Sequence, residues 1–270
     1  MSQVPVGDHF ERVATAFSQK ALVYDEFGRD HENLTRMREK VYAHICRLVP
    51  PGGHLLELNA GTGLDAVALV QRGYRVHATD LSPGMVAQIR NKIVRYDLGD
   101  RLTVQQCSFT ALDEVNGRFH AVYSNFGGLN CIDDLSLVTR HLPRLLFPGG
   151  IVTWVVMPHI CPWELAHFWR GVRSALRRLR PGGVLANVEG VRFRTYYFSV
   201  NEVRRAFGPQ FRQVALEGLS VVTPTADNKH FAQRYPRLYR QLVRLDDWLC
   251  QKRPFSGWGD FFILSMRYEG

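Results

Sequence analysis

Two glycines and a later carboxylate form the pattern with the clearest chemical meaning in this sequence. An apolar run at residues 55–58 leads into Gly61 and Gly63, and Asp80 ends the next apolar run. Glycines at such a turn let a ligand approach backbone N–H groups and the start of the following helix closely. An acidic side chain after the second strand can accept hydrogen bonds from a ribose hydroxyl pair. The pattern therefore predicts a nucleotide-type ligand at the ends of two neighbouring strands.

These residues alone leave two classes of ligand open. Gly61, Gly63 and Ala66 satisfy G-x-G-x-x-A, which is typical of dinucleotide-binding enzymes such as NAD-dependent oxidoreductases. The same strand, turn and helix can hold other cofactors that contain a ribose. The flanking residues have to separate the two classes.

The flanking residues resemble those of class I S-adenosylmethionine-dependent methyltransferases of the small-molecule type. Glu57, Gly61, Thr62 and Gly63 match the family's first motif, in which an acidic residue precedes a turn that ends Gly-Thr-Gly. Residues 80–85, 119–125 and 145–150 resemble the second motif, the fourth-strand motif and the turn that follows. The resemblance covers about residues 50–157, with the motifs in the family's order and spacing.

This resemblance implies that the cofactor is S-adenosyl-L-methionine, with S-adenosyl-L-homocysteine as the product. It implies that Asp80 holds the ribose, that Met85 flanks the adenine, and that Tyr24 belongs to a leading helix that folds over the cofactor. The residues expected to bind the cofactor are Tyr24, Glu57, Asn59, Gly61, Gly63, Asp80, Leu81, Met85, Ser108, Phe109 and Asn125.

The sequence departs from the family pattern at two places. Asn59 stands where many members have the first glycine of the turn, and asparagine tolerates unusual backbone angles better than most residues. Ser108 follows the third strand where many members have an aspartate for the adenine amino group. Ser108 or the backbone is expected to serve instead, with Phe109 packing on the adenine face.

Methyl transfer from a sulfonium is an in-line displacement that needs alignment and exclusion of water, and it needs no metal. A base is required only when the nucleophile carries a proton that must leave. His159 and Tyr196 are the candidate catalytic residues, because both are expected near the ends of the central strands. Asn125 is followed by Phe126-Gly127-Gly128 rather than by Pro-Pro-Tyr, which disfavours methylation of nucleic-acid bases.

Apolar strands alternate with amphipathic helices along most of the chain. Residues 8–49 are expected to be helical, strands are expected at 54–58, 74–79, 102–106, 119–124, 151–157, 213–222 and 260–268, and further helices at 62–71, 83–96, 134–146, 199–207 and 234–250. This alternation predicts an α/β fold with a Rossmann-like sheet of seven mostly parallel strands flanked by helices.

The chain is expected to have four parts. They are an N-terminal helical lid (1–49), a cofactor-binding Rossmann-like core (50–157), a substrate cap inserted after the fifth strand (158–198), and a segment that completes the sheet and carries a helical insertion (199–270).

The composition indicates which classes of partner the protein could bind, but it does not identify one. The net charge is +9, and the arginines gather in two stretches, one from Arg170 to Arg212 and one from Arg234 to Arg244. Such stretches could contact an anionic substrate, a carrier protein, a membrane or a nucleic acid, or could only face water. The five cysteines show no CxxC spacing, and no secretory or membrane-spanning segment is evident, so a cytoplasmic location is expected.

The predicted function is methyl transfer to an oxygen or carbon of a small-molecule acceptor, which could be anionic or carrier-bound. The alternatives are an RNA or protein methyltransferase that uses the arginine-rich surface, an NAD-dependent oxidoreductase, and a non-methylating relative that only binds the cofactor.

Overall fold

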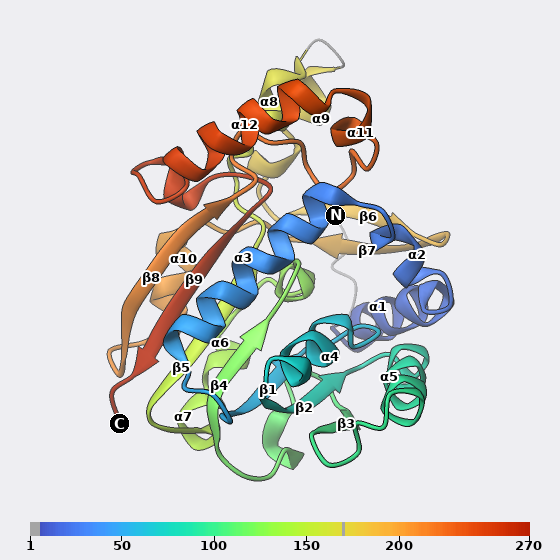
Figure 1. Ribbon diagram of the computed structural model, residues 1–270, viewed down its shortest axis with the longest axis vertical. Coiled ribbons are helices and arrows are strands. Elements are labelled where there is room, and N and C mark those ends of the chain that lie inside the picture. Colours follow the sequence, from blue (N-terminus) through green and yellow to red (C-terminus); the bar gives the residue numbers. More distant parts are fainter. Residues whose placement is uncertain (1–5, 169–170) are drawn as a thin grey trace.

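A seven-stranded sheet forms the centre of the computed structural model, which describes residues 6–168 and 171–270 (Figure 1). The strand order is β3-β2-β1-β4-β5-β9-β8, and only β9 runs antiparallel to its neighbours. The prediction of a mostly parallel seven-stranded α/β sheet is therefore confirmed. The strands are β1 (His54–Leu58), β2 (Arg75–Asp80), β3 (Leu102–Gln106), β4 (Phe119–Ser124), β5 (Leu146–Val156), β8 (Phe211–Leu219) and β9 (Phe261–Tyr268).

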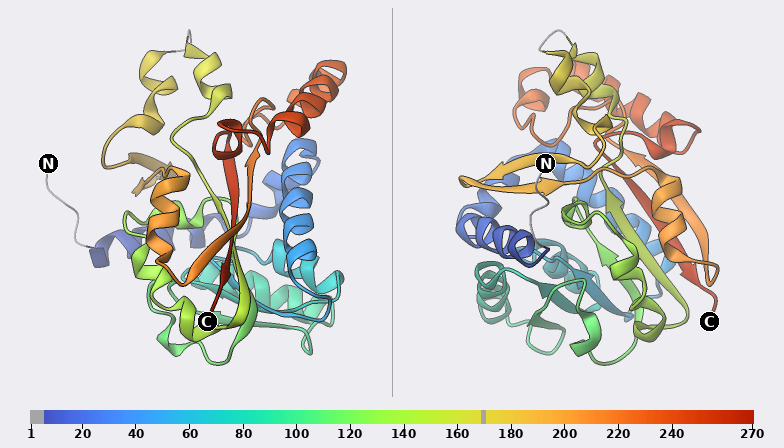
Figure 2. Two further views of the ribbon diagram at one scale, coloured as in Figure 1. Left: turned by 90° about the vertical axis from the view of Figure 1, so that its left-hand side faces the viewer. Right: turned by 180° about the vertical axis from the view of Figure 1, so that it is seen from behind.

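Helices cover both faces of the sheet, and Figure 2 (left) shows the sheet nearly edge-on between them. On one face, Leu55 packs with residues of α3 (Glu32–Leu48), α4 (Leu64–Gln71) and α5 (Pro83–Arg95). On the other face, Leu56 packs with residues of α6 (Ser136–Thr139), α7 (Leu142–Leu145) and α10 (Val200–Phe207). Successive side chains of a strand point to opposite faces, so an unbroken apolar strand requires cover on both sides.

Two further groups of elements lie at the carboxyl edge of the parallel strands. One comprises α1 (Val6–Lys20) and α2 (Tyr24–Gly28), together with the hairpin of β6 (Val184–Val188) and β7 (Val191–Thr195). The other comprises α8 (Pro162–Ala166), α9 (Val172–Ala175), α11 (Phe231–Arg234) and α12 (Pro236–Leu249) at the upper end of Figure 1. Short 3-10 turns complete the chain: η1 (Leu112–Glu114), η2 (Gly128–Cys131), η4 (Arg177–Leu179) and η5 (Phe255–Gly257).

The hairpin is a feature that the sequence reasoning missed. Its turn is Glu189-Gly190, and both residues have positive φ, 49° and 82°. Val188 pairs directly with Val191, so the loop has two residues, the form whose twist suits a β-hairpin. Phe193 packs with Ala16 of α1, so the hairpin and α1 share a small core of their own.

The residues expected to be helical, 8–49, form three helices, α1, α2 and α3. Two other elements were predicted wrongly. The expected helix at 134–146 is two short ones, α6 and α7, because Pro143 has no N–H to continue the helical hydrogen bonds. Leu146 already pairs with Phe119, so β5 begins there and the following Pro-Gly-Gly forms an irregularity within the strand.

The four-part division of the chain stays a prediction. Residues 1–5 of the expected lid and 169–170 of the expected cap, including Arg170, lie outside the described residues.

A substitution at Gly63 tests the packing of α4 against α5. Gly63 has φ +79°, and a Cβ there would lie 2.9 Å from Cγ1 of Ile89. Gly63→Ala is therefore expected to lower the free energy of unfolding by about 1–3 kcal/mol, measured by urea denaturation. Gly99 is the matched control, because a Cβ there meets nothing within 4 Å and its φ is not positive. Equal stability of the two variants would contradict this account.

Candidate functional site

The turn between β1 and α4 has the backbone geometry that the glycine pattern predicts. Asn59, Gly61 and Gly63 all have positive φ, at 49°, 58° and 79°. Asn59 also uses its side chain, since its Oδ1 accepts a hydrogen bond from Ser124 Oγ at 2.8 Å. Asn59 thus adopts the positive φ of the turn and hydrogen-bonds the turn to β4, which explains why a glycine is not required at this position.

Asp80 ends β2 with its carboxylate against this turn. Its Oδ2 accepts from the N–H of Gly61 and its Oδ1 from the N–H of Ser82, both at 2.8 Å. Burial raises the pKa of Asp80 to about 6, although these backbone N–H groups act to lower it. Each carboxylate oxygen still has a free lone pair, so the group can accept two further hydrogen bonds from a ligand.

A cavity of about 110 Å³ opens beside Asp80, between the carboxyl ends of the central strands and helices α1 and α2. Eight of the residues predicted to bind the cofactor line it: Tyr24, Asn59, Gly61, Asp80, Leu81, Met85, Phe109 and Asn125. These residues come from five separate stretches of sequence, so the fold brings together what the motifs only suggested.

Three predicted binding residues do not line the cavity. Glu57 is 1% exposed within the sheet, where burial and the nearby charge of Asp65 raise its pKa well above the ordinary value. Gly63 faces Ile89 of α5. Ser108 bonds Thr110 through its hydroxyl at 2.8 Å.

Asn125 is the unsatisfied group of this cavity. It follows β4, is 7% exposed, and neither its amide nitrogen nor its amide oxygen has a partner within the described chain. Buried polar side chains are nearly always hydrogen-bonded, so an amide that lines a cavity with both atoms free is poised for a polar ligand.

Helix α2 is fastened over the turn by a charged cluster. Asp25 accepts a hydrogen bond from the hydroxyl of Thr62 and pairs with Lys92 Nζ at 2.6 Å. Lys92 also donates to the carbonyl of Thr62 at 2.8 Å. The ring of neighbouring Tyr24 then lies 4.0 Å from the point where a Cβ on Gly61 would stand.

The two residues predicted as catalytic lie elsewhere. His159 lines a separate cavity of about 420 Å³, where Nδ1 lies 2.9 Å from the carbonyl of Arg178 and Nε2 lies 3.1 Å from Glu202. Tyr196 packs against the core cluster that includes Val203 and Phe207 of α10, and its backbone hydrogen-bonds with Asn130. Neither lines the cavity beside Asp80, so the geometry gives no support to either as a base.

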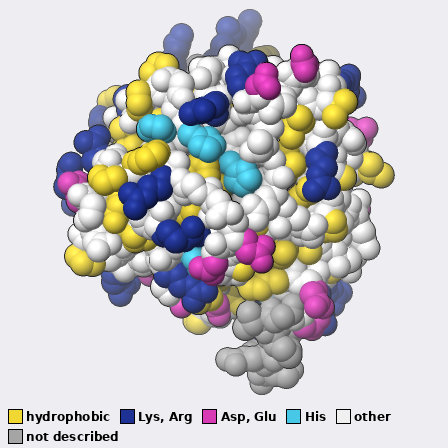
Figure 3. All heavy atoms as spheres, turned by 90° about the horizontal axis from the view of Figure 1, so that it is seen from below, with side chains coloured by type: hydrophobic (Ala, Val, Ile, Leu, Met, Phe, Trp, Pro, Cys, Tyr) yellow, Lys and Arg dark blue, Asp and Glu magenta, His cyan; other side chains and the backbone are white. Residues whose placement is uncertain are grey.

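A group of other histidines lies far from the site, whereas His9 lies next to it and contacts the carbonyl of Cys131 at 2.7 Å without lining the cavity. Figure 3 views the molecule from below and shows histidine side chains gathered on that surface. His54 lies at the start of β1, and burial and the charges of Arg75, His77 and His120 lower its pKa. This surface is at the opposite end of the strands from Asp80, so these imidazoles cannot act at the cavity.

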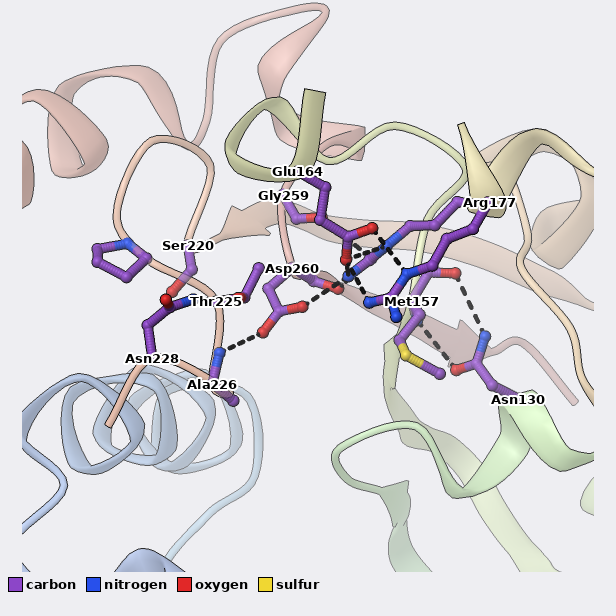
Figure 4. Close-up of polar contacts among 12 residues, drawn as sticks. Asn130, Met157, Glu164, Arg177, Ser220, Thr225, Ala226, Asn228, Gly259 and Asp260 are labelled. Carbon is purple, nitrogen blue, oxygen red and sulfur yellow. Dashed lines mark hydrogen bonds and ion pairs between the residues drawn. The ribbon is translucent and has the colours of Figure 1, made fainter. Parts of the chain in front are cut away.

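A buried ion-pair network supports the upper part of the molecule (Figure 4). Arg178, 3% exposed, donates to Glu164 at 2.7 Å and to Asp260 at 2.8 Å, and the other carboxylate oxygen of Asp260 accepts from the N–H of Ala226. Cys161 lies close enough to both acids for the three to form a potential metal-ligand group. The guanidinium groups of Arg177 and Arg178 already neutralise those two acids, so we interpret the group as a structural ion-pair network.

Several residues that line the cavity were not among those expected to bind the cofactor, although Phe10 and Ala14 resemble the family's leading helix. One set is Phe10, Val13, Ala14 and Phe17, whose spacing places them on one face of α1. The others are Ser82, Cys107, Phe126, Gly127, Gly128 and Cys131. The helical spacing extends that resemblance to Val13 and Phe17. The cysteines could not have been found, since an isolated thiol in an apolar setting resembles ordinary core.

The strand order and the turn at Gly61 beside Asp80 are typical of α/β domains that bind a nucleotide-type cofactor. Residues 55–150 match the model of a family described as the methyltransferase domain. The chain therefore contains a class I S-adenosylmethionine-dependent methyltransferase domain.

Curated relatives and a solved structure agree with this assignment. The chain is 30% identical over 148 residues to a demethylmenaquinone methyltransferase of Corynebacterium efficiens, covering 55% of this chain and 54% of that one. It is 30% identical over 174 residues to a malonyl-[acyl-carrier protein] O-methyltransferase of Halorhodospira halophila, covering 61% and 54%. The chain thus spans about half the length of these relatives. The CcbJ methyltransferase of Streptomyces caelestis shares the fold, with a TM-score of 0.63, 18% identity, and 95% and 98% of the two chains covered.

Proposed function

We propose that the protein transfers a methyl group from S-adenosyl-L-methionine to an oxygen or carbon of a small-molecule acceptor. The observation that carries the proposal is the convergence of Gly61, Asp80 and the unsatisfied amide of Asn125 on one cavity. When bound, the cofactor supplies an electrophilic methyl group on a sulfonium sulfur.

The residues around the cavity fit this cofactor in type. Asp80 would accept hydrogen bonds from the ribose hydroxyls, and Phe109, edge-on to Phe10 at 6.1 Å between ring centroids, would pack on the adenine. Asn125 offers both a donor and an acceptor, which suits the ammonium and carboxylate of the methionine part. Helix α1 would exclude water with its apolar face.

The cavity must open before a cofactor can enter. Its volume of about 110 Å³ is below the roughly 300–1,000 Å³ that is typical of ligand pockets. Helices α1 and α2 close it, and α2 is held by few polar contacts, which are those of Asp25 with Thr62 and Lys92 and that of Lys229 with the carbonyl of Glu26. We infer that this N-terminal segment acts as the lid that admits the cofactor and then covers it.

The side chains that line the cavity indicate what kind of nucleophile the acceptor can carry. No imidazole lines the cavity within the described chain, and burial raises the pKa of Cys131 to about 12 and also raises that of Cys107. These thiols stay protonated at neutral pH. We therefore favour an acceptor whose nucleophile is already deprotonated and needs no protein base, such as a carboxylate, a phenolate or the carbon of a preformed enolate.

Two of the curated relatives are described as acting on demethylmenaquinone and on a malonyl group bound to an acyl-carrier protein. Both names fit the acceptor chemistry favoured here, so the acceptor can be free or carrier-bound. The segment at 158–198 would cap the acceptor, since it lies beyond the carboxyl edge of the sheet.

Turnover in the presence of candidate acceptors tests the proposal. Purified protein is incubated with S-adenosylmethionine and either a demethylated quinol or a malonyl-carrier conjugate, and S-adenosylhomocysteine and methylated product are measured by mass spectrometry. With one of the two classes of acceptor, we expect S-adenosylhomocysteine and the methylated acceptor to form in equal amounts. Methylation of RNA or protein instead, or tight cofactor binding without any methylated product across the acceptors, would contradict the proposal.

The affinity for S-adenosylhomocysteine should depend on pH through Asp80. Its pKa of about 6 in the protein lies above the ordinary 3.8, so the carboxylate that accepts from ribose is lost as the pH falls through 6. The dissociation constant is expected to rise about tenfold between pH 7 and pH 5. Calorimetry at both values measures this, with Asp80→Asn as the control that should show weak but pH-independent binding. A flat profile for the wild type would contradict the role of Asp80.

A further inference from the structure

The outward face of α12 carries large apolar side chains in the open. Leu238 is 46% exposed, Leu245 43% and Trp248 62%. Their spacing of seven and three residues places them on one stripe along the helix. The opposite side of the helix is buried, where Tyr239 donates to Asn33 of α3 at 3.0 Å.

Arginines flank this stripe. Arg237, Arg240 and Arg244 are exposed, and no carboxylate in the described part of the chain pairs with them. Just beyond the helix, Lys252 lies over the ring of Trp248, with Nζ 3.1 Å from the ring centroid. Long cationic side chains beside exposed aromatic and aliphatic groups can keep their charge in water while the stems cover apolar surface.

The two acidic residues of α12 both pair with cations of α3. Asp246 is fully buried and pairs with Arg36 of α3 at 3.0 Å, while its other oxygen accepts from the N–H of Val221. Asp247 pairs with Arg36 at 2.6 Å and with Lys40 at 2.9 Å. The carboxylates of α12 therefore do not pair with the arginines beside the apolar stripe, and the stripe has cationic surroundings.

We propose that the outward face of α12 binds a membrane surface rich in anionic phospholipid. A surface helix with an apolar stripe, a tryptophan and flanking arginines has the composition of helices that lie in the headgroup layer. A second copy of the chain fits less well, because a two-fold contact would bring the arginines of both copies together. A nucleic acid would use the arginines but would leave the aliphatic stripe without a role.

The position of α12 allows such contact. In Figures 1 and 2 the helix lies at the upper end of the molecule in every view, at the same end as α8 and α9. The cap segment exposes apolar residues there too, with Val172 61%, Leu176 43% and Leu179 50% exposed. This binding does not depend on the proposed activity.

Vesicle co-sedimentation tests the proposal with the full chain. The vesicles are pure phosphatidylcholine or equal parts of phosphatidylcholine and phosphatidylglycerol. The wild type is expected to bind only the anionic vesicles. Removing three arginines together (Arg237→Gln, Arg240→Gln, Arg244→Gln) should weaken partitioning about 100-fold, since each cation near the surface contributes roughly a factor of five. Leu245→Ser with Trp248→Ser should weaken it as well, because the stripe inserts.

A control removes the same charge from α10 and the hairpin (Arg192→Gln, Arg204→Gln, Arg205→Gln), and should leave vesicle binding within about threefold of the wild type. Trp248 contacts Lys252 and Arg205 bonds the carbonyl of Asn201, whereas the other altered residues have no polar side-chain partner in the described chain. Thermal unfolding checks that each variant folds. An equal loss of vesicle binding in the control variant would mean that binding depends only on net charge, and would overturn the proposal. The proposal would also be overturned if the wild type bound no vesicles. This includes the case in which it binds RNA instead, and the case in which it self-associates in sedimentation equilibrium instead.

Discussion

Replacing Arg178 with methionine is expected to lower the free energy of unfolding by about 3–5 kcal/mol. The guanidinium is the only cation in contact with Asp260 among the described residues, and the carboxylate of Asp260 is 7% exposed. Methionine would fill part of the space but would leave a buried charge without a partner. Chemical denaturation at pH 7 measures the loss.

Arg177→Met is the matched control for that experiment. Arg177 contacts the same Glu164 at 2.8 Å, but its side chain is 41% exposed. The loss there is expected to stay below about 1 kcal/mol, since exposed ion pairs contribute little. Burial raises the pKa of Asp260, so the instability of Arg178→Met should shrink as the pH is lowered and the acid takes up a proton. Equal losses in both variants would contradict the buried network.

Replacing Asp80 with alanine is expected to weaken S-adenosylhomocysteine binding by at least about 100-fold. Hydrogen bonds to a charged group contribute roughly 1.5–3 kcal/mol each, and a ribose offers two hydroxyls. The carboxylate also holds the N–H groups of Gly61 and Ser82, so its loss loosens the turn that meets the ligand. Calorimetry measures the change.

Asp100→Ala is the control, because that carboxylate is exposed in the loop before β3. It should bind S-adenosylhomocysteine as the wild type does. If folded Asp80→Ala protein bound S-adenosylhomocysteine with wild-type affinity, the assignment of the cofactor to this cavity would be contradicted.

The central sheet could be predicted because its signals are local. Each parallel strand is a short apolar run, and each is followed by a turn with glycine, proline or a capping residue, as at Ser82 before α5. The same signals placed Gly61 and Asp80 at neighbouring strand ends. Motif resemblance added Asn125 and Met85, which the structure places on the same cavity.

The misses have a different origin. The hairpin at residues 184–195 depends on a Glu-Gly turn, whose first residue is an unusual choice for positive φ. His159 was placed correctly after β5, but its partners Arg178 and Glu202 are distant in sequence. Long-range contacts of that kind decide which way a side chain faces, and no pattern along the chain encodes them.

One titration tests the central claim most directly. Folded wild-type protein is titrated by calorimetry with S-adenosylhomocysteine and, separately, with NAD, and both are repeated on Gly61→Val. Gly61 has φ +58°, which a β-branched residue adopts only with strain, so the substitution distorts the turn. We predict micromolar binding of S-adenosylhomocysteine, no binding of NAD, and loss of the first in Gly61→Val. Preference for NAD, or no S-adenosylhomocysteine binding by the folded wild type, would contradict the account.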